Sequence, residues 1–195
     1  MAEPARVSSQ SGVTHSDAAL VVAARAGDAS AREGLFRRHM PVAIGLSQRI
    51  LGRQGEAEDV VQDAFVEAFE RLDRLDNPQA FAAWLRSIVV HRVSKHLRRQ
   101  QLLMRLGMRT RVPIDPDTLI ARGAPAEVVQ ELRAVYGVLE RLPAEQRVAL
   151  VLRRVEGLEL SEIAAQMQLS LATVKRRLAA AEARLGRARA GGREP

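Results

Sequence analysis

The chain of 195 residues carries 30 lysine and arginine residues against 23 aspartate and glutamate residues, so its net charge is +7. This excess of positive charge, with an isoelectric point near 11.1, favours a polyanionic partner. The absence of cysteine excludes disulfides, zinc-finger sites and thiol catalysis. Aromatic residues are only 3% while Ala, Leu, Arg and Glu dominate, which predicts an all-α fold, and the length allows two small domains.

The first stretch, residues 1–16, is polar, and we predict a disordered tail there because it lacks the apolar core of a signal peptide. No apolar run approaches the length of a membrane span, since the run from Leu20 stops at Arg25. The protein is therefore expected to be cytoplasmic, with no membrane insertion.

Capping residues divide the next stretch into helices. Ser16 and Asp28 are favourable N-caps, each at the start of a predicted helix. Gly27 and Gly52 are suited to end these helical segments. Pro41 falls inside the second helical pattern, where it either kinks the helix or begins a new one.

A strongly amphipathic helix is predicted over residues 56–75. Its apolar residues recur at helical spacing and form one buried stripe. The outer face is polar and mainly acidic, and consists of Glu58, Asp59, Gln62, Asp63 and Glu67. Considered alone, such a face is most simply a solvated surface.

A long basic helix is predicted to begin at Asn77 and Pro78, an N-cap followed by a first-turn proline, and to end near Leu106. No acidic residue occurs from Asn77 to Ile114. An unbroken cationic edge fits a track for phosphate groups. Its candidate contacts are Arg86, His91, Arg92, Lys95, Arg98 and Arg99. No carboxylate or cysteine lies at metal-ligand spacing from the histidines, so no metal site is predicted.

Glycine and proline residues interrupt the periodicity after the basic helix, so residues 107–124 are predicted to be a flexible linker. The linker separates an N-terminal helical domain at 17–106 from a C-terminal domain at 125–189, which is followed by a tail at 190–195. Helices are expected in the C-terminal domain over 126–140 and 143–155.

Two short helical patterns with a tight turn between them fill residues 160–185. Ser170 is a favourable N-cap for the second pattern, whose apolar stripe is Leu171, Val174, Leu178, Ala181 and Leu185. The turn position that usually carries glycine is Gln168, so a left-handed backbone there would be slightly strained. The pattern is typical of a helix-turn-helix, whose second helix enters the DNA major groove. The candidate DNA contacts are Ser170, Thr173, Lys175, Arg176 and Arg177.

An acidic amphipathic helix, a basic helix, a linker and a C-terminal helix-turn-helix together resemble a known family. The chain after about Asp17 resembles sigma factors of the extracytoplasmic-function subgroup of the sigma-70 family. Four segments in the same order carry the resemblance, namely AEDVVQDAF (57–65), FAAWLRSIV (81–89), LPAEQR (142–147) and EGLELSEIA with LSLATVKRRL (156–178).

The resemblance implies roles that composition does not supply. The surface of Glu58, Asp59, Gln62 and Asp63 would bind the clamp helices of core RNA polymerase. The loop 73–79 and the basic helix would bind the −10 promoter element as melted single strand, and the second helix of the helix-turn-helix would read the −35 element. The linker would run toward the active-site and RNA-exit channels of the polymerase. An anti-sigma factor is a further implied partner, and no cofactor is expected.

Trp84, the only tryptophan, is expected to belong to the core, because the matching tryptophan of the family faces neighbouring helices. Arginine suits guanine because its forked donors match two acceptors on one base edge. Arg176 or Arg177 is therefore expected to be the main base-reading residue, with Lys175 chiefly on phosphate.

The chain departs from the family pattern in both DNA-binding helices. Val90, His91 and Lys95 stand where family members often carry an Arg-Asn pair and an Asp. Ala179 and Ala180 stand where a further basic pair is usual. These positions leave the class intact and bear on the choice of promoter.

Two other classes of function remain open at this point. A self-sufficient regulator would bind duplex operator DNA without polymerase, using its N-terminal helices to sense a ligand or dimerise. A helical interaction protein without DNA binding would leave the acid-free basic segment unexplained. An enzyme has no support, because the sequence contains no phosphate-cradling glycine loop, no metalloprotease motif and no nucleophile elbow.

Overall fold

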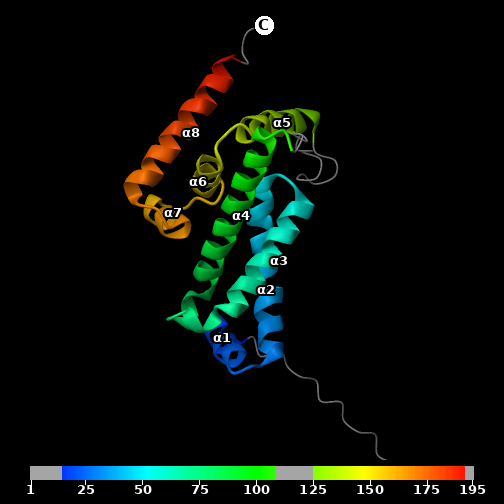
Figure 1. Cartoon of the computed structure of the whole chain (residues 1–195), viewed down its shortest axis with the longest axis vertical. Helices are drawn as coiled ribbons and strands as arrows, with labels where there is room; N and C mark the ends of the chain where they lie inside the picture. Colours follow the sequence, from blue (N-terminus) through cyan, green and yellow to red (C-terminus); the bar gives the residue numbers. More distant parts are fainter. Residues whose placement is uncertain (1–14, 109–124, 192–195) are drawn as a thin grey trace, which may run out of the picture.

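The structure is a computed structural model that describes residues 15–108 and 125–191 of the chain. Within these residues it contains eight α-helices, two short 3-10 helices and no strand, which confirms the predicted all-α fold. The helices form an N-terminal domain (α1–α4) and a C-terminal domain (α5–α8) (Figure 1). Their bounds are α1 Asp17–Arg25, α2 Ala29–Leu51, α3 Gln54–Glu70, η1 Leu72–Arg74, η2 Pro78–Ala80, α4 Phe81–Arg105, α5 Ala126–Leu139, α6 Ala144–Arg154, α7 Leu160–Met167 and α8 Leu171–Gly191.

The ends of α1 and α2 are set by the predicted caps. The Ser16 hydroxyl accepts a hydrogen bond from the Ala19 N–H at 3.2 Å. A carboxylate oxygen of Asp28 accepts from the Ser30 N–H at 2.7 Å, and Gly52 closes α2 with a left-handed backbone of φ +68°. These bonds satisfy backbone groups that a helix end would otherwise leave unpaired.

Helix α2 continues unbroken through Pro41, so the alternative of a new helix beginning there is wrong. A proline inside a helix removes one backbone hydrogen bond. Burial offsets this loss, because Leu35 before the proline and Leu46 and Ile50 after it all pack into the same core.

Helix α3 ends at Glu70, earlier than the predicted end at residue 75. The next residues form the 3-10 helix η1, and the side chain of Arg25 explains the change. Its guanidinium donates to the carbonyl of Leu72 at 2.9 Å and to the carbonyl of Leu75. Both leucines remain buried, so the apolar stripe continues after the α-helix has stopped.

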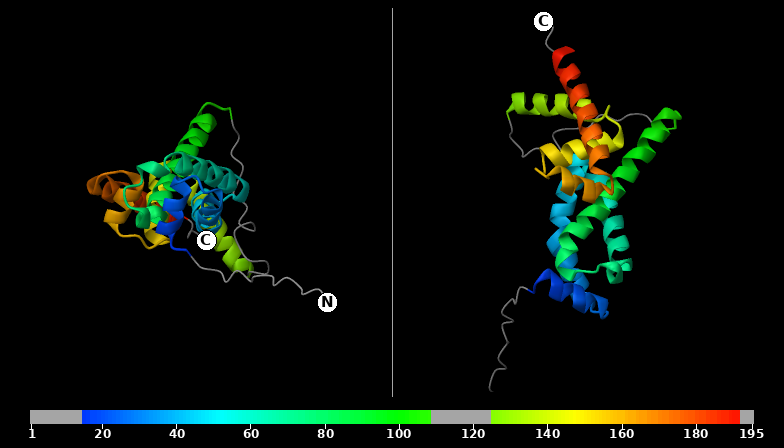
Figure 2. Two further views of the ribbon diagram at one scale, coloured as in Figure 1. Left: turned by 90° about the horizontal axis from the view of Figure 1, so that it is seen from below. Right: turned by 90° about the vertical axis from the view of Figure 1, so that its left-hand side faces the viewer.

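Helix α4 lies at the centre of the molecule, with α2 and α3 along one side and α6, α7 and α8 along the other (Figure 1). The side view shows the C-terminal helices against the upper half of the N-terminal domain, with α1 at the far end (Figure 2). Helices α6 and α7 contact α4 directly, and α6 also contacts α2. The two domains therefore share an interface.

Polar side chains bridge this interface. The Gln101 amide on α4 donates to the carbonyl of Leu142 at 2.9 Å and accepts from the N–H of Ala144 at 3.3 Å. Further along α4, Gln166 of α7 donates to the carbonyl of Ala83 at 3.3 Å. The C-terminal domain therefore covers one flank of α4 along much of its length.

The predicted linker lies mostly outside the described residues, apart from its first two residues. Gly107 ends the path of α4 with a left-handed backbone of φ +69°. The predicted tail at residue 190 begins too early, because α8 continues to Gly191. In the described part of the chain, no helix combines the length and apolarity that a membrane crossing requires.

Candidate nucleic-acid interface

The second helix of the helix-turn-helix, α8, begins as the sequence predicts. The Ser170 hydroxyl accepts from the Thr173 N–H at 3.2 Å and lies 2.9 Å from the Thr173 hydroxyl. The preceding turn contains Gln168 in the left-handed conformation, with φ +53°. This is the only left-handed residue other than glycine in the described ranges, so the helix-turn-helix accepts the predicted strain at its turn.

The apolar stripe of α8 is buried with one exception. Val174, Leu178 and Ala181 are buried, and Leu185 packs against the core. Leu171 is 44% exposed, so its predicted place in the core is wrong. It is the first residue of α8, and the core begins one turn later at Val174.

The basic face of α8 divides into two parts. Lys175 and Arg176 are exposed, as a base-reading surface requires. Arg177 is half-buried instead, and its Nη2 lies 2.6 Å from Oε2 of Glu145 on α6. Arg176 is therefore better placed than Arg177 to reach a base edge.

The basic face of α4 is narrower than the sequence indicates. His91, Lys95 and Arg99 are exposed. Nine residues of an α-helix turn through about 180°, so Arg86 projects from the side of α4 opposite Lys95. The structure thus does not bring Arg86 onto the same face.

Arg92 and Arg98 have carboxylate partners. The Nε of Arg92 donates to Oε2 of Glu67 on α3 at 2.5 Å, and its Nη1 lies 3.7 Å from Asp63. Arg98 donates from Nη1 to Oε1 of Glu145 at 3.4 Å. Both arginines are thus paired with carboxylates in this arrangement, and their contact with phosphate stays a prediction.

The acidic face of α3 is exposed as predicted except at Glu67, whose side chain is only 12% exposed. Glu58, Asp59, Gln62 and Asp63 all lie on the solvent side of the helix. Among them is Val66, which is 54% exposed. Val66 follows Gln62 and Asp63 at spacings of four and three, which a helix places on one face. The sequence reasoning missed it, although an apolar residue on a polar face is a visible signal.

Glu56 at the start of α3 lies between the two long helices of the N-terminal domain. Its Oε2 accepts from Gln100 at 2.6 Å and lies 3.3 Å from the His96 ring. The hydrogen bond from His96 is the largest cause that lowers the pKa of Glu56 from 4.5 to about 2. His96 is thus a structural partner of a carboxylate, and the described residues contain no group of side chains suited to hold a metal ion.

Trp84 packs against the core, as expected from the family pattern, but it is half-buried and not among the fully buried residues. Its ring centroid lies 6.1 Å from that of Phe81, and the side chain is half-buried against the hydrophobic core. It is therefore not an open stacking platform.

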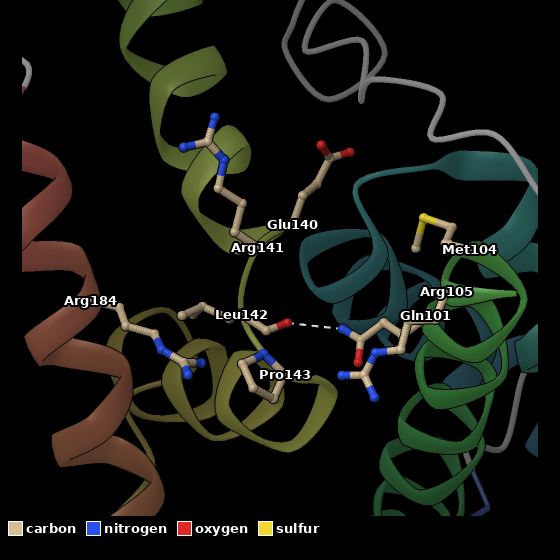
Figure 3. Close-up of a pocket in the computed structure, with 8 residues that line it drawn as sticks. All are labelled: Gln101, Met104, Arg105, Glu140, Arg141, Leu142, Pro143 and Arg184. Carbon is tan, nitrogen blue, oxygen red and sulfur yellow. Dashed lines mark hydrogen bonds between the residues drawn. The ribbon is translucent and has the colours of Figure 1, made fainter. Parts of the chain in front are cut away.

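A cavity of about 370 Å³ opens where the two domains meet (Figure 3). Arginines from three elements line it, namely Arg105 of α4, Arg141 between α5 and α6, and Arg184 of α8. Arg184 also donates to the side chain of Gln146 at 2.8 Å. The cavity therefore brings three guanidinium groups, together with the carboxylate of Glu140, to the domain junction.

Arg147 on α6 is 4% exposed, which is unusual for a charged residue. Its Nε and Nη2 have no hydrogen-bond partner within the described residues. Burial is the main cause that lowers the pKa of Arg147 from 12.5 to about 10.

Comparisons with known proteins identify the family that has these helices. The family model for sigma-70 region 2 matches residues 35–102, and the model for sigma-70 region 4 matches residues 132–185. The first match covers α3 and α4 up to residue 102, and the second covers α7 and α8 up to residue 185.

Relatives extend the similarity over most of the chain. The ECF RNA polymerase sigma factor SigM of Mycobacterium tuberculosis (strain H37Rv) is 33% identical over 172 residues, which are 88% of this chain and 84% of the relative. The ECF RNA polymerase sigma-E factor of Escherichia coli (strain K12) is 31% identical over 177 residues, with 83% of this chain and 88% of the relative covered.

Solved structures show the same fold. CnrH, in complex with the cytosolic domain of CnrY, matches 87% of this chain and 94% of its own with a TM-score of 0.57 and 29% identity. The sigma factor RpoE of Bartonella quintana, in complex with the anti-sigma factor NepR, matches 80% of this chain and 94% of its own with a TM-score of 0.58 and 21% identity. The chain belongs to the sigma-70 family of RNA polymerase sigma factors, in the ECF group.

Proposed function

We propose that this sigma factor binds core RNA polymerase through the outer face of α3 and engages promoter DNA with two separate basic faces, on α4 and α8. One observation carries the proposal. The segments that match sigma-70 regions 2 and 4 contain three exposed helix faces: cationic faces on α4 and α8 and an acidic face on α3. Promoter recognition at two elements requires two separated DNA-binding surfaces.

The α3 face fits a protein partner better than mere solvation. Asp59, Gln62 and Asp63 lie on the same face as the exposed Val66, within the two turns before it, so the face combines acidic groups with an apolar side chain. Interfaces commonly consist of an apolar centre with a polar rim. A partner with a basic surface and a small apolar contact would match this face, and we propose the clamp helices of the polymerase.

The exposed cations of α4 support binding to the melted −10 element. His91, Lys95 and Arg99 form a continuous stripe, since they follow one another at spacings of four. Single-stranded DNA is commonly bound by a positively charged groove that follows the backbone. With Trp84 in the core, base stacking on that residue is not part of the proposal.

The exposed start of α8 supports reading of the −35 element in duplex form. Base contacts of a helix-turn-helix come from the first turns of its second helix. Arg176 is assigned the base contact and Lys175 a phosphate contact. Ser170 and Thr173 at the amino end of the helix can approach the DNA backbone.

An anti-sigma factor is a further proposed partner. The two solved structures cited above hold their sigma factors in complex with the cytosolic domain of CnrY and with NepR. Similarity to both supports the proposal that this chain has a protein partner of the same kind.

Run-off transcription tests the proposal. The purified chain with core polymerase should transcribe from a cognate promoter selected from a randomised DNA pool, and the chain alone should give no tight band shift on the same duplex. A tight, sequence-specific band shift without polymerase, together with no transcription, would favour a self-sufficient regulator instead.

A further inference from the structure

One carboxylate joins the two DNA-binding faces. Glu145, in the first turn of α6, lies with Oε1 3.4 Å from Arg98 of α4 and with Oε2 2.6 Å from Arg177 of α8. Arg98 belongs to the N-terminal domain, whereas Glu145 and Arg177 belong to the C-terminal domain. The pair with Arg98 therefore spans the domains, and the pair with Arg177 lies within one domain.

Other contacts across the same interface are also charged or polar. Arg49 of α2 donates to Glu156 at 2.6 Å, and the Arg53 guanidinium lies 3.9 Å from Glu140. The Tyr136 hydroxyl donates to the carbonyl of Arg49 at 3.3 Å. Ion pairs of partly exposed side chains weaken as salt increases.

The interface also contains a destabilising element. Arg147 is buried on α6 with two of its nitrogens unpaired within the described residues, and charged groups of both domains act on it, including Arg53. A buried, incompletely paired cation disfavours the state that buries it. The packed arrangement thus combines favourable surface ion pairs with an unfavourable buried charge, which suits a contact that has to open.

We propose that Glu145 is a latch that, through its ion pair with Arg98, holds the two domains in a closed arrangement in which Arg98 is withheld from DNA. The inference rests on the proposed function, because it concerns the regulation of the same two faces. In the closed arrangement α6 and α7 cover one flank of α4, and Glu145 occupies both guanidinium groups. The phosphate groups of DNA are negatively charged like the carboxylate and can replace it at Arg98 once the domains separate.

Distances between spin labels measure this opening in the full-length chain. The chain has no cysteine, so two can be introduced without background, as Val42→Cys on α2 and Ala183→Cys on α8. Both positions are exposed and neither belongs to a proposed contact. The wild-type background should give mainly one short distance by pulsed electron-spin resonance. Glu145→Gln should shift the distribution to longer distances, as should salt raised from about 50 to 500 mM.

Two arginine variants form a matched pair of tests. Arg98→Ala removes only the ion pair that spans the domains and should lengthen the distances between the spin labels as Glu145→Gln does. Arg177→Ala removes only the ion pair within the C-terminal domain and should leave the distances between the spin labels unchanged. Equal behaviour of the two variants, or a Glu145→Gln chain that stays closed, would overturn the latch.

Binding to a single strand tests the consequence for DNA. The probe is a single-stranded oligonucleotide of about 10 nucleotides carrying a −10 sequence, within the usual length of a single-strand site. Glu145→Gln should bind it about three- to tenfold more tightly than wild type at the same salt. The reason is that apparent affinity is proportional to the fraction of chains in the open, binding-competent arrangement. Opening without tighter binding would also overturn the proposal. Failure of the proposed function would be seen separately, as a wild-type chain that forms no complex with core polymerase whatever the spin labels report.

Discussion

Arg92 on α4 donates to Glu67 on α3 at 2.5 Å, so a residue of the acid-free basic helix pairs with the acidic helix beside it. Oε1 of Glu67 also lies 2.6 Å from Arg71, so the two carboxylate oxygens pair with two different arginines. The pair joins the proposed polymerase-binding helix to the proposed −10-binding helix. Positive charge on α4 therefore has two uses, one within the fold and one toward DNA.

Replacing Arg92 and Lys95 separately should distinguish these two uses. Arg92→Ala is expected to lower the free energy of unfolding by about 1 kcal/mol, because it removes a partly buried ion pair. Lys95→Ala is expected to leave stability unchanged and to lower the salt slope of promoter binding by about one. Urea denaturation and salt titration measure the two effects. The assignment fails if Arg92→Ala leaves stability intact and alters only the salt slope.

Charge reversal on α3 should weaken polymerase binding. Asp59→Lys changes an exposed residue of the acidic face, so binding to core polymerase is expected to fall by at least about tenfold while helix content is unchanged. Glu33→Lys is the matched control, since it makes the same charge change at an exposed site on α2. Equal affinities of the two variants in an equilibrium binding assay would exclude this face as the polymerase interface.

Arg176 and Lys175 should differ in what they recognise. Arg176→Ala is expected to cost about 1–3 kcal/mol on the preferred promoter and to relax the preference at one −35 position. Lys175→Ala should weaken all promoter sequences alike. The measurement is transcription from a panel of −35 variants with core polymerase. A flat profile for Lys175→Ala and a changed one for Arg176→Ala are expected, and the reverse would exchange their roles.

Two substitutions on α8 test its buried stripe. Val174 is 0% exposed, so Val174→Asp is expected to destabilise the C-terminal domain by at least about 3 kcal/mol, since it buries an unpaired carboxylate. Leu171→Asp, at the exposed first position of α8, should be tolerated. Hydrogen exchange of α8 reports the difference while core-polymerase binding through α3 is retained. Protection of α8 in the Val174→Asp chain would contradict the structure.

Acid should remove a specific contribution to stability at Glu56. The pKa of this carboxyl is lowered from 4.5 to about 2, chiefly by the hydrogen bond from His96. A carboxyl whose pKa is lower in the folded state stabilises that state at pH values above the pKa of the unfolded state. This stabilisation is lost as the pH falls from about 4.5 toward 2. Glu56→Gln should therefore be less stable than wild type at pH 7, with the difference declining over that range. A difference that stays constant with pH would exclude this cause.

Local features of the fold could be predicted from the sequence because their causes lie within a few residues. The caps at Ser16, Asp28 and Ser170 depend on a side chain and an amide two or three positions away. The left-handed turn at Gln168 follows from the spacing of two helical patterns. Each of these was predicted correctly for that reason.

Contacts between distant segments could not be predicted in the same way. Glu145 meets Arg98 across 47 positions of sequence, and nothing in either local pattern indicates the pair. Arg92 and Arg177 are less available on the basic faces than the sequence indicates, also because of contacts between distant segments. Each is paired with a carboxylate on another helix. The shortened α3 likewise depends on Arg25, which lies 47 residues before Leu72.

The position of Trp84 gives the protein an intrinsic optical reporter. It is the only tryptophan of the chain, and it follows Ala83, whose carbonyl accepts the hydrogen bond from Gln166 of the C-terminal domain. Separation of the domains would break this hydrogen bond and expose the backbone one residue before the indole to water. Its emission maximum can therefore be followed in stopped-flow mixing with polymerase or DNA, without any added dye, to time the first step of promoter engagement.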